Sequence, residues 1–157
     1  MKATLALDLA TRTGWALRRK DGSLLSGVQN NKPTSRDSRG MLFLRFEWWL
    51  EPMMEREEVG LIAYEQPHLR GGPPTEVLVG LVSIMQKIAA ERAAEFTSCH
   101  SSTLKKFATG RGNARKPDMI RMANELWPEQ GIVDDNQADA LWLLAWIESQ
   151  KPAEGPF

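Results

Sequence analysis

Carboxylates close two of the apolar runs in this sequence, an arrangement typical of divalent-metal chemistry. Asp8 ends the run 3–8, and Glu65 ends the run 61–65. Asp139 stands between two alanines near the start of the last predicted helix, where an unpaired carboxylate is costly and a bound cation is the better explanation. Magnesium and similar ions bind oxygen ligands, so these three residues predict a metal site. The alternative is that Asp8 and Glu65 are exposed carboxylates at strand ends that bind no metal.

Other metal ligands and nucleophiles are scarce. Cys99 is the only cysteine, and His68 and His100 are the only histidines. The sequence therefore has no internal disulfide, no zinc site with Cys/His spacing and little scope for a Cys-His nucleophile pair. We expect any bound metal to be held by oxygen atoms.

The formal net charge is +0 at pH 7, but the charges are segregated along the chain. Segment 104–121 has Asp118 as its only acid against these basic residues: Lys105, Lys106, Arg111, Arg115, Lys116 and Arg121. From Glu125 onwards the sequence is acidic, with Lys151 as its only base. A basic segment suits DNA phosphates, and an acidic cluster beside it suits cations. Solvated helix faces of opposite sign are the alternative.

Hydropathy patterns predict the elements that must position these residues. Three strands joined by short turns come first, at 2–9, 13–19 and 23–28, and such connections make them antiparallel. Apolar residues recur at helical spacing over 41–57, and 59–65 is an apolar run typical of a central parallel strand. A helix, a weak strand and three further helices are predicted at 75–90, 93–99, 102–108, 117–126 and 134–148.

These elements predict an α/β fold, with a mixed five-stranded sheet of three antiparallel strands followed by two parallel ones and helices on both faces. Glycines and prolines at 71–74 are predicted to break the chain. The length of 157 residues and the 42% hydrophobic content predict one domain over 1–150 and a loose tail at 151–157. No apolar stretch approaches the roughly 18 residues of a membrane span, and the first residues lack a signal-peptide pattern. We expect a cytoplasmic protein with no membrane association.

The order of these motifs resembles the RuvC family of Holliday junction resolvases, which have the RNase H-like fold. The resemblance rests on Asp8, on Tyr64-Glu65-Gln66 at the end of the fourth strand, and on Ala138-Asp139-Ala140-Leu141 in the last helix. Residues 104–110, followed by Gly112 and Lys116, are similar to the family's lysine-bearing helix and the loop that leads to a second lysine. The resemblance extends from about residue 3 to residue 147.

The resemblance implies a divalent-metal-dependent endodeoxyribonuclease that cuts four-way (Holliday) or otherwise branched DNA. Two Mg²⁺ or Mn²⁺ ions in each active site would support phosphodiester hydrolysis. Asp8 would bridge the two ions, Glu65 would hold one of them and Asp139 the other. Family members are homodimers, and the helix 75–90, apolar on more than one side, suits an interface with a second copy. A monomer with a deeply buried helix is the alternative.

The resemblance also assigns roles to the basic residues. Lys105 and Lys116 match the lysines that contact DNA phosphate and stabilise charge at the scissile group. Ordinary surface lysines are the alternative for these two residues, whereas Lys106, Arg111 and Arg115 suit contacts to the DNA backbone. In addition, His68 follows the glutamate by three residues, where the family often carries an aromatic residue that probes the junction centre. A histidine can stack on a base, and a plain loop histidine fits the sequence equally well.

Two departures from the family pattern affect the predicted site. Asn136 stands where the family has Asp or His, and its amide oxygen is a neutral, weaker ligand. Asp135 is the substitute ligand if the helix start is rotated, whereas Asp134 or Asp135 can also simply cap the helix. Leu9-Ala10 replaces the usual Pro-Gly, which indicates a divergent, phage-type branch in a bacterial or phage-infected cell.

Three other functions remain open from sequence. The weaker ligand at Asn136 is compatible with a non-catalytic protein that binds branched DNA. A ribonuclease H-type nuclease would share the fold but would not explain the basic segment. An actin-like ATPase or sugar kinase is suggested by the two threonines of segment 8–14, but such proteins usually enclose nucleotide between two domains of this kind.

Overall fold

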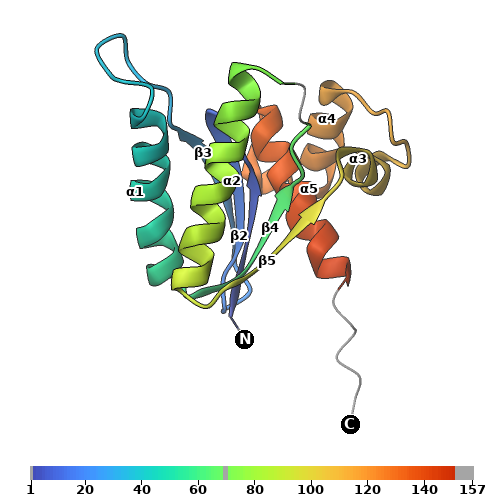
Figure 1. Cartoon of the computed structure of the whole chain (residues 1–157). Helices are drawn as coiled ribbons and strands as arrows, with labels where there is room; N and C mark the ends of the chain where they lie inside the picture. The colour runs from blue at the N-terminus through green and yellow to red at the C-terminus, as the bar shows by residue number, and fades with distance from the viewer. Residues whose placement is uncertain (1, 69–70, 151–157) are drawn as a thin grey trace.

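The computed structural model describes residues 2–68 and 71–150, and a five-stranded mixed sheet lies at its centre (Figure 1). The strand order is β3-β2-β1-β4-β5. The strands are β1 (Ala3–Asp8), β2 (Arg12–Arg18), β3 (Leu24–Asn30), β4 (Val59–Glu65) and β5 (Glu95–Cys99). The first three are antiparallel neighbours, and β4 runs parallel to both β1 and β5. The predicted sheet is therefore confirmed, while the predicted tail 151–157 lies outside the described residues.

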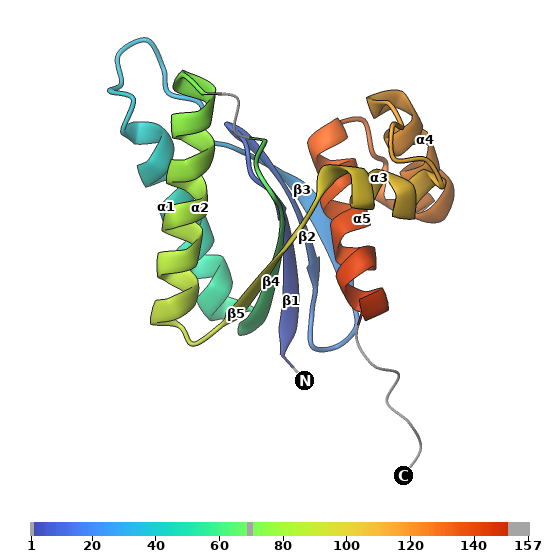
Figure 2. The same cartoon turned by 45° about the vertical axis from the view of Figure 1, so that its right-hand side comes forward.

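Helices cover both faces of this sheet (Figure 2). One face carries α1 (Met41–Arg56) and α2 (Pro73–Glu91). The other face carries α3 (Ser101–Thr109), α4 (Lys116–Leu126) and α5 (Asp135–Gln150), with a short 3₁₀ turn, Pro128–Gln130, between the last two. Among the described residues, no helix is long and apolar enough to cross a membrane.

Strand β1 separates two hydrophobic cores because its side chains alternate between the faces of the sheet. Leu5 and Leu7 pack in the core beneath α1 and α2. Ala6 points the other way and, with Ala16 and Ala63, contributes to the core beneath α5. These small side chains allow α5 to lie close to the sheet, and its Trp142 indole donates a hydrogen bond to the Met119 carbonyl at 3.1 Å.

The start of α2 differs from the sequence prediction. Pro73 and Pro74 do not break the chain but form the first two residues of the helix. Backbone N–H groups at this position have no partner within a helix, so proline loses nothing there, and its fixed φ suits the first turn. Gly72 precedes them with φ of 76°, a conformation that glycine adopts without strain.

The part of the chain that the structure describes covers α2 on one side only. Leu81, Met85 and Ile88 are fully buried, whereas Val79 on the outer side is 46% exposed. The apolar character that the sequence shows on more than one side of this helix therefore leaves an uncovered apolar surface beside β5.

Candidate metal centre

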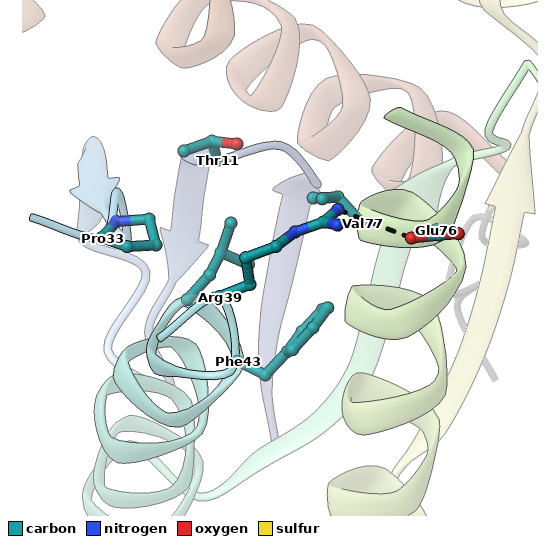
Figure 3. A pocket seen from close by; sticks show the side chains of 7 residues that line it. Thr11, Pro33, Arg39, Phe43, Glu76 and Val77 are labelled. Carbon is teal, nitrogen blue, oxygen red and sulfur yellow. Dashed lines mark hydrogen bonds and ion pairs between the residues drawn. The ribbon is translucent and has the colours of Figure 1, made fainter. Parts of the chain in front are cut away.

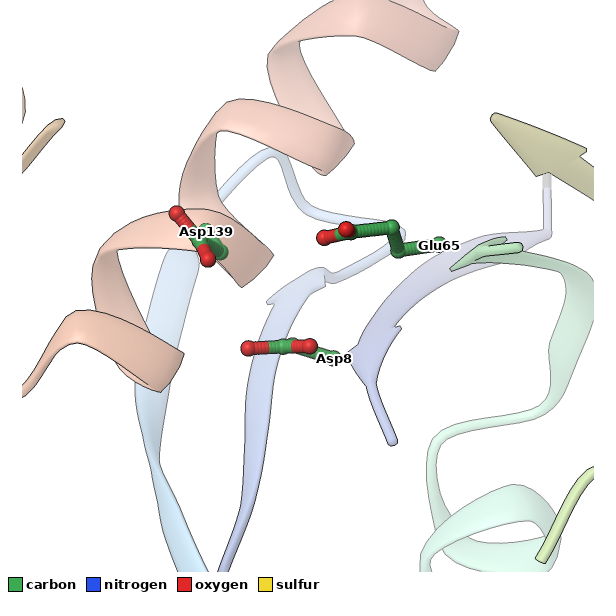
Figure 4. Close-up of side chains that lie close together, drawn as sticks. All are labelled: Asp8, Glu65 and Asp139. Carbon is green, nitrogen blue, oxygen red and sulfur yellow. The ribbon is translucent and has the colours of Figure 1, made fainter. Parts of the chain in front are cut away.

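Three carboxylates converge at one edge of the sheet (Figure 4). Parallel pairing places Leu7 of β1 beside Tyr64 of β4, so the next residue of each strand, Asp8 and Glu65, ends at the same edge. Asp139 reaches the same point from α5 (Figure 4). One carboxylate oxygen from each residue lies within 4.8 Å of the others. The geometry thus brings together the three carboxylates that the sequence predicts as metal ligands.

Gly14 allows α5 to come close enough for this convergence. It lies opposite Asp8 in the pairing of β1 with β2. A Cβ atom at Gly14 would stand 1.9 Å from the Asn136 carbonyl oxygen and 2.9 Å from the Gln137 nitrogen. The first turn of α5 therefore rests directly on the β2 backbone, which only glycine permits. Gly14 is not among the site residues predicted from sequence, although a glycine inside a strand pattern is a known signal of close backbone approach.

Asp134 fixes the start of α5. One of its carboxylate oxygens accepts a hydrogen bond from the Asn136 backbone N–H at 2.8 Å, and the other pairs with Arg12 of β2 at 3.1 Å. This is the capping interaction expected of aspartate before a helix. Of the two capping candidates in the sequence, the structure selects Asp134.

Burial and mutual repulsion perturb the acid groups of the cluster. The pKa of Asp8 lies well above its ordinary value because the group is buried, and because Asp139 and then Glu65 repel its charge. Burial likewise raises the pKa of Asp139 to about 7, with further contributions from Glu65 and Asp135. Carboxylates arranged in this way favour protons or cations as neighbours. Their oxygen atoms, mutual closeness and burial fit a divalent ion such as Mg²⁺ or Mn²⁺.

Polar and basic groups on α3 and in the segment after β4 oppose this effect at Glu65. Burial raises the pKa of Glu65, whereas a hydrogen bond from Ser101 and the charges of Lys105 and His68 lower it. Lys105 also lowers the pKa of Asp139. Ser101 was missed in the sequence analysis, because a serine at the start of a helix is an ordinary helix signal.

Lys116 reaches the cluster from the start of α4. Its Nζ lies 3.1 Å from an oxygen of Asp135, and this hydrogen-bonded ion pair raises the pKa of Lys116. The Lys116 charge also lowers the pKa of Asp139. Asp135 is thus paired with a lysine and is not one of the three convergent carboxylates. The choice between Asn136 and Asp135 as a further ligand stays a prediction.

The remaining predicted DNA-binding residues lie in two places. His68 lines a cavity of about 170 Å³ together with Asp8 and Glu65. Lys106, Arg111 and Arg115 are exposed on α3 and in the loop before α4. Within the described residues, no ion pair or hydrogen bond joins these three side chains to the carboxylates. As sequence neighbours of Lys105 and Lys116, they form a basic border on α3 and before α4.

No family model matches the chain, and no curated protein matches its sequence. Solved structures do match. Thermus thermophilus RuvC aligns over 90% of this chain and 90% of its own, with a TM-score of 0.67 and 16% identity. In complex with a Holliday junction substrate, T. thermophilus RuvC aligns over 91% and 90%, with a TM-score of 0.71 and 17% identity. The chain has the fold of the RuvC resolvases. The yeast mitochondrial Holliday junction resolvase Ydc2 aligns over 89% and 76%, with a TM-score of 0.58 and 13% identity.

The RuvC-like fold confirms the resemblance seen in the sequence at the level of backbone architecture. Identities this low describe the arrangement of strands and helices and assign no function to a residue. The chemistry of the RuvC-like chain must therefore be argued from its own side chains. The most informative of these side chains are Asp8, Glu65 and Asp139, because they lie close together and the pKa values of Asp8 and Asp139 are strongly raised.

Proposed function

We propose that this chain is a divalent-metal-dependent endonuclease that cuts branched DNA, and four-way junctions in particular. The observation that carries the proposal is the convergence of Asp8, Glu65 and Asp139 within 4.8 Å, beside Lys105 and Lys116. The fold supports it, because one of the structures that shares it is T. thermophilus RuvC in complex with a Holliday junction substrate. The basic border on α3 and before α4 provides the charge that DNA phosphates require.

The carboxylates would hold two Mg²⁺ or Mn²⁺ ions. Asp8 would be the ligand common to both ions in this proposal, because it ends β1, the central strand of the sheet. Glu65 would hold one ion and Asp139 the other, with Asn136 or Asp135 as a further ligand. Bound ions of this kind activate a water for attack on phosphorus and stabilise the leaving oxygen.

The lysines act on the DNA rather than on the ligands. Lys105 and Lys116 bind non-bridging oxygens of the scissile phosphate and stabilise the charge that builds up there in the transition state. Asp135 holds Lys116 in place through their ion pair. His68 lies beside Asp8 and Glu65 and would stack on a base near the branch point.

The uncovered side of α2 supports a homodimer. Val79 and Phe96 of β5 are 46% and 43% exposed. Val79 and Val82 line a cavity of about 250 Å³ with Tyr64, whose ring lies 6.5 Å from that of Phe96. A second copy on this surface would provide two active sites for one junction. Val79→Asp should give a monomer in light scattering, whereas Leu44→Asp on α1, at a residue 40% exposed, should leave the dimer intact.

The decisive experiment is incubation with labelled four-way junction, replication fork, plain duplex and RNA–DNA hybrid in Mg²⁺ and in Mn²⁺. We expect metal-dependent cutting of the branched DNAs, and no cutting by Asp8→Asn or Glu65→Gln, although both variants should still bind the junction. Preferred cutting of the hybrid would instead indicate a ribonuclease H-type enzyme. Junction binding without cutting in either metal would favour the non-catalytic protein that the weak ligand Asn136 suggests.

A further inference from the structure

The loop between β3 and α1, residues 31–40, carries a positive charge that the proposed site does not use. It exposes three basic side chains, those of Lys32, Arg36 and Arg39. Its only acid, Asp37, is already paired, because Arg45 of α1 lies 2.5 Å from the carboxylate. The loop therefore presents three cations and no free anion to its surroundings.

Hydrogen bonds hold this loop in a defined shape. The Arg45 guanidinium donates to the Lys32 carbonyl at 2.8 Å, and the Asp37 carboxylate accepts from the Thr34 N–H at 2.8 Å. The Asn30 side chain accepts from the Lys32 N–H at 3.0 Å. The Thr34 hydrogen bond, followed by that of Arg45, lowers the pKa of Asp37, so the carboxylate stays charged and the loop stays anchored. A loop ordered in advance loses little conformational entropy when it binds.

A groove of about 540 Å³ separates the loop from the first turn of α2 (Figure 3). Apolar side chains form much of its lining, including Pro33, Phe43 and Val77. Arg39 and Glu76 meet across it at 3.5 Å, with side chains 73% and 71% exposed. An ion pair this exposed contributes little stability, so an incoming anion can replace Glu76 as the partner of Arg39.

The groove continues towards the metal centre. An adjoining cavity of about 410 Å³ shares Thr11, Arg39 and Val77 with it, and also contains Leu78. Leu78 in turn lines the cavity that contains Asp8 and Glu65. In Figure 2 the loop lies on the side of the sheet that α1 and α2 cover and the α3–α4 segment lies on the other side, both towards the end of the sheet where β1 and β4 finish. The carboxylates therefore lie between two basic surfaces.

We propose that loop 31–40 and this groove bind the DNA on the side of the scissile phosphate away from Lys105 and Lys116. Lys32, Arg36 and Arg39 contact phosphates, and Arg39 exchanges Glu76 for a phosphate oxygen. The apolar lining of the groove contacts the hydrophobic faces of the deoxyribose rings between those phosphates. The inference rests on the proposed function, since it takes DNA as the substrate and extends its contacts beyond the α3–α4 border.

The first test compares two triple variants in binding to a labelled four-way junction, in chelator and between 50 and 200 mM salt. One variant replaces Lys32, Arg36 and Arg39 by alanine. The control removes the same charge towards the other end of α1 and α2, at Arg56, Lys87 and Arg92. If three phosphate contacts are lost, the salt slope should fall by about 2 to 3 and the affinity near 100 mM salt by about 10- to 100-fold. The control variant should bind as the wild type does.

The second test looks for a gain of affinity, which misfolding does not produce. Glu76→Gln removes the only acid that lines the groove and should strengthen junction binding by about two- to fivefold, because a negative charge beside the phosphates disappears. Glu55→Gln is the matched control, since Glu55 is 74% exposed and pairs with Arg92 at 3.6 Å but lies near the C-terminal end of α1. Its affinity should not change.

The outcomes separate this inference from the proposed function. A wild type that binds and cuts branched DNA while the loop variant and Glu76→Gln behave like their controls would refute the loop contact alone. In that case, loss of binding on replacing Lys106, Arg111 and Arg115 would show that the DNA binds at the basic border instead. A wild type that neither binds nor cuts any of the DNAs would overturn both.

Discussion

The burial of Asp139, together with repulsion from neighbouring carboxylates, predicts that Asp139→Asn stabilises the metal-free protein at alkaline pH. The pKa of Asp139 is about 7 in the folded protein, against about 3.9 in an unfolded chain. Because the folded state holds this proton more tightly, the contribution of Asp139 to stability is largest below about pH 4 and is lost as the pH rises to about 7. Asparagine cannot ionise, so the variant escapes this loss.

The size of the effect follows from the same two values. The two pKa values differ by about 3, and one pKa unit corresponds to about 1.4 kcal/mol. The loss of folding free energy caused by Asp139 therefore has an upper limit on the order of 4 kcal/mol. Asp8 and Glu65 share the repulsion, and solvent screens part of it, so we expect a gain of about 1–3 kcal/mol at pH 8. For a chain of this length that corresponds to a rise of roughly 3–10 °C in Tm.

The assay is thermal unfolding of the wild type and Asp139→Asn between pH 5 and pH 8.5, in chelator and in Mg²⁺. In chelator, the Tm of the variant should exceed that of the wild type by a margin that grows as the pH rises. Added Mg²⁺ should stabilise the wild type, because an ion that binds only the folded state shifts unfolding, and should do little for the variant. Asp21→Asn is a control of opposite sign, since hydrogen bonds from Ser23 lower the pKa of Asp21. A variant that is no more stable than the wild type at pH 8 would refute the raised pKa of Asp139 on which this prediction depends.

Three further predictions address the neighbours of the cluster. Gly14→Ala should cost on the order of 2–3 kcal/mol in denaturant unfolding and abolish cutting, because its Cβ would meet the Asn136 carbonyl at 1.9 Å; Gly112→Ala, whose nearest contact would be 3.5 Å, should be tolerated. Asn136→Asp should raise the cutting rate in Mg²⁺ and Asp135→Asn should leave it nearly unchanged if position 136 is the ligand, and the reverse pattern would make Asp135 the ligand. Lys105→Ala should slow single-turnover cutting more than it weakens junction binding, and a normal rate on saturated junction would make Lys105 a binding residue only.

Much of the sheet could be predicted from local patterns. Strand β4 was predicted with its observed bounds, 59–65, because an apolar run closed by Glu65 is a strong local signal. The start of α2 was not, because Pro73 and Pro74 are helix breakers inside a helix and helix starters in its first turn. Which of these applies depends on where the chain turns onto the sheet.

For the site, too, local sequence predicts the residues, and tertiary structure decides which of them meet. Asp8, Glu65 and Asp139 were recognised because a carboxylate after an apolar run, or inside an apolar helix, conflicts with its surroundings. That they meet depends on the pairing of β1 with β4 and on the absence of a side chain at Gly14, neither of which hydropathy encodes. Lys116 likewise meets Asp135 only because α4 and α5 begin side by side.

The groove beside loop 31–40 is a product of tertiary structure alone. In sequence, Arg39 and Glu76 are ordinary surface charges separated by a helix and a strand. They face each other because α1 and α2 pack on the same face of the sheet. The sequence by itself determined which segments are buried and which residues are chemically out of place, since both follow from the transfer of side chains out of water. Only the packing of distant elements decided which of those residues share a site, because that depends on close contacts between backbones far apart in the chain.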